Sequence, residues 1–272
     1  MEILGYVLAA IVGVSLGLIG SGGSILTVPI LVYVMGINPL LATAYSLFIV
    51  GSTALVGGVQ RAIQKKVDIK TVFIFGAPSI AAVYATRVWL VPLIPDEILS
   101  LGSLIITKSI ALLLLFAAVM ILASISMIKS AKEKETTHEK KPVFYNYPLI
   151  LINGAVVGLL TGLIGVGGGF LIIPALVLLA RMPMKIAVGT SLLIIAANSL
   201  IGFMGDLQGG YVFDWRLLAS FTGLAVIGIF IGSWLSKKVS ADKLKKAVGW
   251  FVLAMGIYII FREIFFSTSG RH

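Results

Sequence analysis

Two glycine clusters interrupt otherwise apolar sequence and could supply backbone groups for binding. They comprise Gly20, Ser21, Gly22 and Gly23 in the first half of the chain, and Gly165, Gly167, Gly168 and Gly169 in the second. Glycine inside a helix costs about 1 kcal/mol relative to alanine, so such clusters favour backbone that unwinds or adopts positive φ. A short helix that begins there carries unpaired N–H groups and the positive end of a dipole. Two such helix starts, facing each other near mid-membrane, would form an anion site without a buried cation.

Close helix packing is the alternative interpretation of these glycines. Gly13 and Gly17 have the small-xxx-small spacing, and so do Gly158 and Gly162, for which packing is a sufficient explanation. Packing alone does not require consecutive glycines, so we favour the binding interpretation for the two clusters.

Hydroxyl and amide side chains near the clusters could donate hydrogen bonds to an anion. Ser24 and Thr27 follow the first cluster, and Thr161 precedes the second. A matching pair of later segments adds further polar residues, namely Ser46, Thr53, Thr190, Ser191 and Asn198. An amide in lipid needs partners, so Asn198 could bind substrate or a coupling ion, or equally form a hydrogen bond between helices.

Charged side chains within apolar sequence are rare and are candidate functional residues. Arg87 lies in the outer third of one apolar segment, where it could attract an anion or extend to the membrane surface as an anchor. No Asp or Glu lies inside the apolar segments, so a carboxylate proton relay is not expected. No catalytic constellation, P-loop or HExxH motif is present. We therefore expect no enzyme activity, no cofactor and no metal site.

The composition indicates the elements that must position these residues. Of 272 residues, 59% are apolar and 12% are charged, and the mean hydropathy is +1.09. Apolar stretches long enough to cross a bilayer recur without period-two alternation, which predicts an all-α integral membrane protein in the lipid bilayer. The chain has no cysteine, which excludes disulfides and thiolate chemistry. The net charge of +10 resides mostly in short loops, so nucleic acid is not an expected partner.

The chain repeats itself at an offset of 145 residues. Residues 13–31 and 158–176 are identical at ten of nineteen aligned positions, which include five glycines and one proline. Each half contains five apolar segments: 3–20, 24–36, 40–58, 71–92 and 105–128, then 148–165, 169–180, 186–204, 216–235 and 247–266. We expect a first transmembrane repeat over residues 1–128, a charged linker over 129–147 and a second repeat over 148–272.

The loop charges indicate that the two repeats have opposite topology. The loop between the third and fourth segments is basic in the first half, with Arg61, Lys65, Lys66 and Lys70. The matching loop of the second half is acidic, with Asp206 and Asp214, and the loops after the fourth segments show the reverse. The positive-inside rule then predicts an inner-membrane protein with a cytoplasmic linker and both termini outside. Inverted repeats with broken or re-entrant helices are a recurring architecture of secondary transporters.

These motifs resemble the TauE/SafE sulfite exporter family of bacterial permeases. The resemblance rests on GLIGSGGSILTVPIL from Gly17, GLLTGLIGVGGGFLIIPALVLL from Gly158, and the stretches 85–92 and 187–192, and it covers essentially the whole chain. It implies transport, usually export, of small sulfur-containing anions such as sulfite, sulfoacetate or related organosulfonates. No motif encodes the substrate within the family.

The sequence therefore predicts a permease that moves a small anion by alternating access. An anion gains about 2.3 kcal/mol per charge and 100 mV on leaving a negative interior, so export needs no coupling ion. An anion channel of the same architecture and a non-transporting membrane scaffold are the alternatives. A homodimer is compatible with the sequence, which does not determine the coupling ion.

Overall fold

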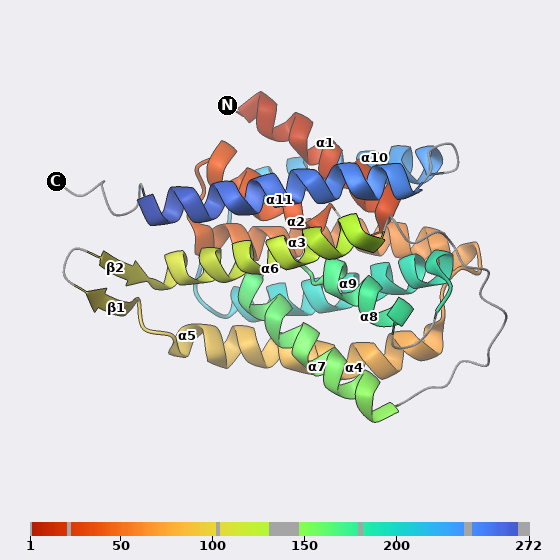
Figure 1. Ribbon diagram of the computed structural model, residues 1–272, viewed down its shortest axis with the longest axis horizontal. Helices are drawn as coiled ribbons and strands as arrows, with labels where there is room; N and C mark the ends of the chain where they lie inside the picture. The colour runs from red at the N-terminus through yellow and green to blue at the C-terminus, as the bar shows by residue number, and fades with distance from the viewer. Residues whose placement is uncertain are drawn as a thin grey trace.

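The computed structural model describes residues 2–20, 23–101, 104–130, 147–178, 182–236 and 241–265. Over these residues the protein is a bundle of helices with one short pair of strands (Figure 1). Five helices are long and apolar enough to cross a membrane, namely Pro39–Ile63, Ile69–Leu93, Lys108–Ile125, Lys185–Leu207 and Trp215–Leu235. Three shorter apolar helices accompany them. The chain is a multi-pass membrane protein.

The elements of the two halves follow the same order. The first half consists of α1 (Glu2–Ile19), α2 (Ser24–Pro29), η1 (Ile30–Val34), α3 (Pro39–Ile63), α4 (Ile69–Ala85), η2 (Thr86–Leu90), α5 (Val91–Leu93), β1 (Glu97–Leu101), β2 (Leu104–Thr107) and α6 (Lys108–Ser130). The second half consists of α7 (Tyr147–Ile164), α8 (Gly169–Leu178), α9 (Met184–Leu207), α10 (Trp215–Leu235) and α11 (Ala241–Phe265). In both halves a long first helix is followed by a short one, directly after a glycine cluster.

Polar caps fix where several of these helices begin. The Asn38 side chain accepts a hydrogen bond from the Leu40 N–H at the start of α3, and Pro39 occupies the first turn, where no N–H is needed. The Asp68 and Asp214 side chains accept backbone N–H groups in the same way at the starts of α4 and α10. Each cap supplies acceptors for N–H groups that have no partner inside the helix.

Two helices widen into π-turns, η1 and η2, next to proline. η1 follows Pro29, and η2 precedes Pro92 in α5. Proline has no N–H to donate to the preceding turn, and the wider turn accommodates the break in the hydrogen-bond ladder. The observed effect of Pro29 on its segment is therefore a local π-turn. Arg87 lies within η2.

Helices of one half pack mainly against helices of the other. α1 packs along α10, α4 along α7, α3 along α9, and α6 along α11. Small residues allow the close contacts: a side chain added at Gly13 would overlap the Ala225 carbonyl in α10, and one added at Gly158 would overlap the Ser79 carbonyl in α4. The packing interpretation of the Gly13 and Gly158 motifs is therefore confirmed.

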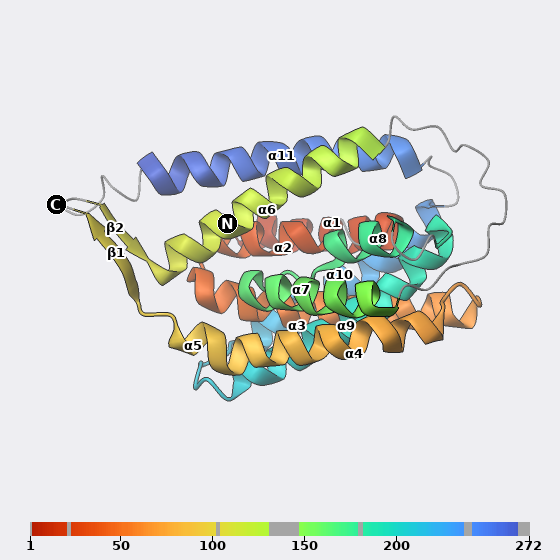
Figure 2. The ribbon, with the colours of Figure 1, turned by 60° about the horizontal axis from the view of Figure 1, so that its bottom comes forward.

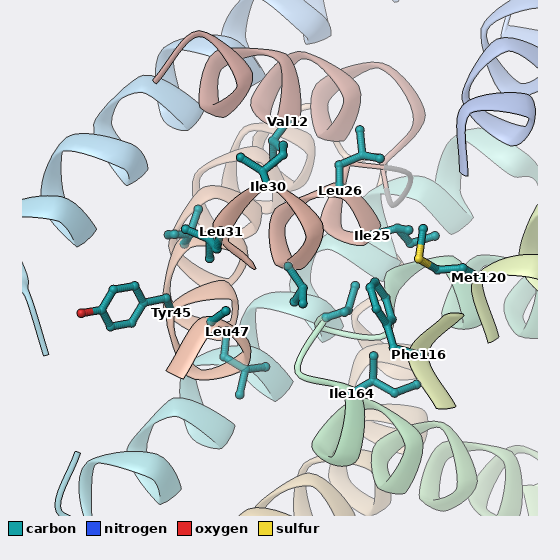
Figure 3. Close-up of a cluster of buried hydrophobic side chains, with 14 of the residues drawn as sticks. Val12, Ile25, Leu26, Ile30, Leu31, Tyr45, Leu47, Phe116, Met120 and Ile164 are labelled. Atoms are coloured by element: carbon teal, nitrogen blue, oxygen red, sulfur yellow. The ribbon is translucent and has the colours of Figure 1, made fainter. Parts of the chain in front are cut away.

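The long helices α3 and α9 run antiparallel through the middle of the bundle. Gly51 of α3 contacts Leu200, and Gly58 contacts Leu193, so their registers run in opposite directions. α2 lies beside α3, and its Ile25 and Leu26 share an apolar cluster with Phe116 and Met120 of α6 (Figure 3). Figure 2 shows α6 and α11 together along one side of the bundle, flanking the other helices.

An antiparallel strand pair replaces the start of one predicted helix. β1 and β2 pair with Leu99 opposite Ile106 and Leu101 opposite Leu104. The fifth apolar segment was expected to begin at residue 105, but α6 begins at Lys108. The run Ile105-Ile106-Thr107 is β-branched at every position and therefore favours extended backbone. The all-α expectation is thus incomplete at this end of the molecule.

Candidate functional site

The second glycine cluster adopts backbone that only glycine takes readily. Gly165, Gly167 and Gly168 have φ of +75°, +69° and +67°. The turn links the end of α7 at Ile164 to the start of α8 at Gly169, and the Gly168 carbonyl accepts the first N–H groups of α8. In this region a side chain costs roughly 1–2 kcal/mol per residue, so glycine at all three positions follows from the conformation.

Polar side chains from several helices surround this turn closely. A Cβ added at Gly165 would lie 2.5 Å from Nη2 of Arg87 and would also overlap Thr43. A Cβ added at Gly167 would lie 2.6 Å from the Ser199 Oγ, and one at Gly168 would overlap the Thr161 Oγ1. The absence of side chains at these three glycines therefore leaves room for the polar atoms beside the turn.

Arg87 is buried, with 4% of its surface exposed, although it lies near the end of a membrane-spanning helix. Its Nη1 donates a hydrogen bond to the Thr43 Oγ1 at 3.1 Å and pairs with the Asp206 Oδ2 at 3.2 Å. Its Nε and Nη2 have no hydrogen-bond partner within the described part of the chain. Arg87 does not extend to the membrane surface as an anchor, and the geometry favours the anion-attracting alternative.

Asp206 is the residue that the sequence interpretation missed. It was assigned to a loop, but α9 continues to Leu207 and holds Asp206 in its last turn with 4% exposure. The expectation that no carboxylate lies within an apolar helix is therefore wrong. A usable signal was present: Asp206 follows Ser199 by seven residues, which is two helical turns and places both on one face.

Tyr211 lies beyond the buried pair, in the turn between α9 and α10. Partial burial raises the pKa of its phenol, the neighbouring carboxylate of Asp206 raises it further, and Arg87 opposes the shift. Asp96 adds a smaller rise in the same pKa. Tyr211 is therefore a neutral hydroxyl near the Arg87–Asp206 pair, at the end of the bundle that carries α5.

Buried hydroxyl groups extend the polar region inward from Arg87. Thr161 Oγ1, Ser199 Oγ and Ser46 Oγ are buried and have no hydrogen-bond partner among the described residues. On α3, Thr43 approaches Gly165 and Val50 approaches Gly167, and Ser46 lies between them on the same helical face. The predicted residues Ser46, Thr161 and Arg87 thus gather around the second glycine cluster, and Ser199 and Thr43 join them.

Asn198 links two helices. Its Nδ2 donates a hydrogen bond to the Ser79 Oγ of α4 at 2.7 Å, both side chains being fully buried. The structure therefore confirms the helix-to-helix bond that was one of the two expectations for Asn198. Its Oδ1 has no partner among the described residues and keeps the capacity to accept one further hydrogen bond.

The first glycine cluster has different surroundings. Ser21 and Gly22 lie outside the described residues. Gly20 has φ of +83° and lies against the apolar side chain of Val188, whereas Gly23 has an ordinary φ of −70°. Ser24 and Thr27 are fully buried in α2. Gly20 and Gly165 thus lie near opposite ends of the antiparallel α3–α9 pair.

Thr190 and Ser191 lie at the other end of α9, away from Arg87. The Thr190 Oγ1 accepts the Asp68 N–H at 2.9 Å, and the Ser191 Oγ donates to the Val188 carbonyl at 2.9 Å. Both hydroxyls therefore take part in structural hydrogen bonds. The Thr190 bond joins the turn between α3 and α4 to α9, whereas the Ser191 bond lies within α9.

The sequence repeat shows that the residues around the second cluster differ from their counterparts. At the offset of 145 residues, the counterparts of Thr43, Thr161 and Ser199 are apolar, namely Val188, Leu16 and Ala54. The counterpart of Asp206 is Arg61, whose Nη2 lies 3.4 Å from the Gly17 carbonyl. Three polar residues around the second cluster thus have apolar counterparts in the repeat.

A narrow pocket lies beside the second cluster. Thr43 and Ile164 line this pocket next to Gly165. Val28, Leu40 and Phe116 also line it. Thr43 therefore lines this space while it holds Arg87. Among the described residues, no group of His, Cys, Asp and Glu could hold a metal ion.

Comparisons with known proteins agree with this arrangement. A family model described as "Sulfite exporter TauE/SafE" matches residues 6–259. A "Probable membrane transporter protein" of Xylella fastidiosa strain 9a5c is 31% identical over 256 residues, covering 93% of this chain and 92% of the relative. The "Probable membrane transporter protein YunE" of Bacillus subtilis is 27% identical over 284 residues, covering 95% and 97%. No solved structure gave a significant match.

Proposed function

Because the chain belongs to the sulfite exporter TauE/SafE family of membrane transporters, which are not enzymes, we propose that it moves small sulfur-containing anions across the cytoplasmic membrane. Sulfite, sulfoacetate and related organosulfonates are the substrate class, and export is the direction. The anion binds at the second glycine cluster and crosses by alternating access. A membrane potential that is negative inside favours this direction for any net negative species.

The buried guanidinium of Arg87 carries this proposal. Two of its nitrogens, Nε and Nη2, are buried without partners among the described residues, and Nη2 faces the glycine turn at Gly165. Arginine presents N–H groups in a planar fork that suits the oxygens of a sulfite or sulfonate group. Unsatisfied buried donors are costly, so a bound oxyanion would remove that cost.

The hydroxyl groups around the turn supply the remaining donors. Thr161, Ser199 and Ser46 each present an unpaired, buried Oγ beside or near the glycine backbone. The anion would lie against Arg87 at one end and these hydroxyls at the other. Gly167 touches Val50 and Ile195, which are at the middle of α3 and α9, so this site would lie near the middle of the membrane.

The helix pairings support two repeats of inverted topology. The first helix of each half packs against the fourth helix of the other, and the third and fifth helices pack against their own counterparts. A two-fold relation between the halves produces this exchange of partners. The ends of α3 and α10 lie together at the right of Figure 1, opposite the strand pair. Basic residues follow α3 there, whereas Asp96 and Asp214 lie at the opposite end, which supports a cytoplasmic right-hand end.

Flux in proteoliposomes tests the proposal. Radiolabelled sulfite and sulfoacetate are loaded inside, and efflux is followed at imposed membrane potentials. We expect efflux that accelerates with an inside-negative potential and is lost in Arg87→Gln. The matched control is Arg216→Gln, because Arg216 is exposed at the start of α10, at the same end of the bundle.

Three results would contradict the proposal in different ways. Efflux of neither anion removes the substrate class, and equal losses in Arg87→Gln and Arg216→Gln remove the site. Efflux that does not respond to unlabelled anion on the opposite side indicates a channel, since only a carrier shows trans-stimulation.

A further inference from the structure

Building on the proposed anion site, we propose that Asp206 takes up one proton when an anion binds Arg87, so that anion and proton cross together. In the structure the Asp206 carboxylate is the anion that faces Arg87, with Oδ2 and Oδ1 at 3.2 Å and 3.3 Å from Nη1. Both side chains are nearly inaccessible, at 3% and 4% exposure. The pair is therefore neutral as a unit and shielded from solvent ions.

A bound substrate changes this balance. An oxyanion at the free Nε and Nη2 of Arg87 places a second negative charge within a few ångströms of the Asp206 carboxylate. Two anions that share one buried cation repel each other strongly, because the surroundings screen charge poorly. Protonation of Asp206 removes the repulsion and leaves one cation facing one anion. The carboxylic acid keeps its proton and can donate a hydrogen bond to the bound oxyanion.

The groups that face Asp206 offer no other source of positive charge. Arg87 faces Asp206 from η2, and Arg87 itself contacts Thr43 of α3 and lies against Gly165 in the turn before α8. Tyr84 of α4 lies beside Gly205, the residue before Asp206. None of these except Arg87 carries a cation, and within the described chain no second salt bridge reaches the pair.

The titratable groups outside the pair cannot take its place. Tyr211 is a neutral phenol, since burial and Asp206 both raise its pKa, and it therefore gains no proton when an anion binds. Asp96 acts on Tyr211 from the end of the bundle, but within the described residues it forms no salt bridge with Arg87. The proton must enter from the aqueous side and reside on Asp206.

Co-binding is compatible with export of a divalent anion. Sulfoacetate has two negative charges, so the anion with one proton still has one net negative charge and still leaves down the potential. A monovalent anion with one proton would move without net charge. Each anion that crosses with one proton therefore moves one negative charge fewer than the free anion, and the voltage dependence of its flux is correspondingly weaker.

Proton movement alongside anion flux tests the inference in the intact protein. Sulfoacetate is the probe, because its acidic groups stay ionised between about pH 6 and pH 8. Efflux of radiolabelled sulfoacetate and internal pH are recorded from the same wild-type proteoliposomes. We expect about one proton per anion, and an apparent anion affinity that weakens by up to about tenfold per unit rise in pH.

Asp206→Asn and Asp214→Asn form the matched pair of variants. Asparagine caps a helix as well as aspartate does, so Asp214→Asn should preserve α10 and keep the proton-to-anion ratio of the wild type. Asp206→Asn should bind sulfoacetate with no dependence on pH, measured as the thermal shift of the detergent-solubilised protein. That shift should exceed the wild-type shift, since Arg87 then lacks its internal anion.

Each outcome distinguishes this inference from the proposed function. Sulfoacetate efflux without proton movement in the wild type overturns the inference and leaves the anion site intact. Retention of the full pH dependence by Asp206→Asn also overturns it. Absence of both sulfite and sulfoacetate efflux refutes the proposed function, and the inference falls with it.

Discussion

A double-mutant cycle on Arg87 and Asp206 tests whether the two side chains form one buried unit. Arg87→Gln leaves Asp206 as an isolated carboxylate, and Asp206→Asn leaves Arg87 as an isolated cation. Both groups are almost inaccessible to solvent at 3% and 4% exposure, so water cannot replace the lost partner. Removal of one member of a buried pair costs about 3–5 kcal/mol.

The double variant should be more stable than either single variant. Glutamine and asparagine are neutral, and their amides can hydrogen-bond to each other across the former 3.2 Å contact. We expect the double variant to lose only about 1–2 kcal/mol, because no buried charge remains. The sum of the single costs is about 6–10 kcal/mol, so the coupling energy is at least about 4 kcal/mol.

Thermal unfolding in detergent measures the cycle. In a protein of this size, 1 kcal/mol corresponds to a Tm shift of about 2–4 °C, so each single variant should unfold roughly 10 °C below the wild type. The double variant should recover more than half of that loss while its anion flux remains absent. Additive Tm losses would show that the side chains do not share a buried site and would refute the geometry on which the anion site depends.

The remaining predictions concern the glycine turn, the hydroxyl groups and the orientation. Gly165→Ala should lower the Tm by roughly 5 °C or more, because φ is +75° and Thr43 and Arg87 leave no space. The control Gly76→Ala should raise the Tm slightly, because Gly76 is helical and has nothing within 4 Å of an added Cβ. Equal Tm shifts in the two variants would contradict the backbone conformation at Gly165. Ser199→Ala should weaken sulfoacetate binding about fivefold without lowering the Tm, as measured by titration, because a buried hydroxyl without a partner stabilises the anion and not the fold. Since the chain has no cysteine, Lys65→Cys and Val212→Cys each give a single labelling site, at opposite ends of the bundle. A membrane-impermeant maleimide should label Val212→Cys in intact cells and Lys65→Cys only after lysis. The reverse pattern would invert the proposed topology.

The helices could be predicted because they depend on local composition. Long apolar runs must be helical in lipid, and aspartate or asparagine followed by such a run marks the helix starts at Asn38, Asp68 and Asp214. The glycine clusters indicated irregular backbone because three glycines in succession have little other use. Positive φ at Gly165, Gly167 and Gly168 agrees with that reasoning.

The chemistry of the site depended on packing between distant segments. Arg87 and Asp206 are 119 residues apart, and no sequence pattern pairs them. The charges of Asp206 and Asp214 suggested that the third apolar segment of the second half ends at residue 204, whereas α9 continues to Leu207 and Asp206 in its last turn pairs with Arg87 of η2. The strand pair was missed because its residues are as apolar as those of a membrane helix. Their β-branching, which favours extended backbone, distinguishes them from such a helix.

The unequal surroundings of the two glycine clusters have a consequence for the direction of flux. Duplicated halves of one fold tend to make the inward-open and outward-open states similar in free energy. Here Thr43 and Thr161 on one side correspond to Val188 and Leu16 on the other, so under the proposed alternating access each reorientation would present the anion to different chemistry. Such a carrier would act as a rectifier: at equal and opposite gradients, the two directions of net flux would saturate at different concentrations.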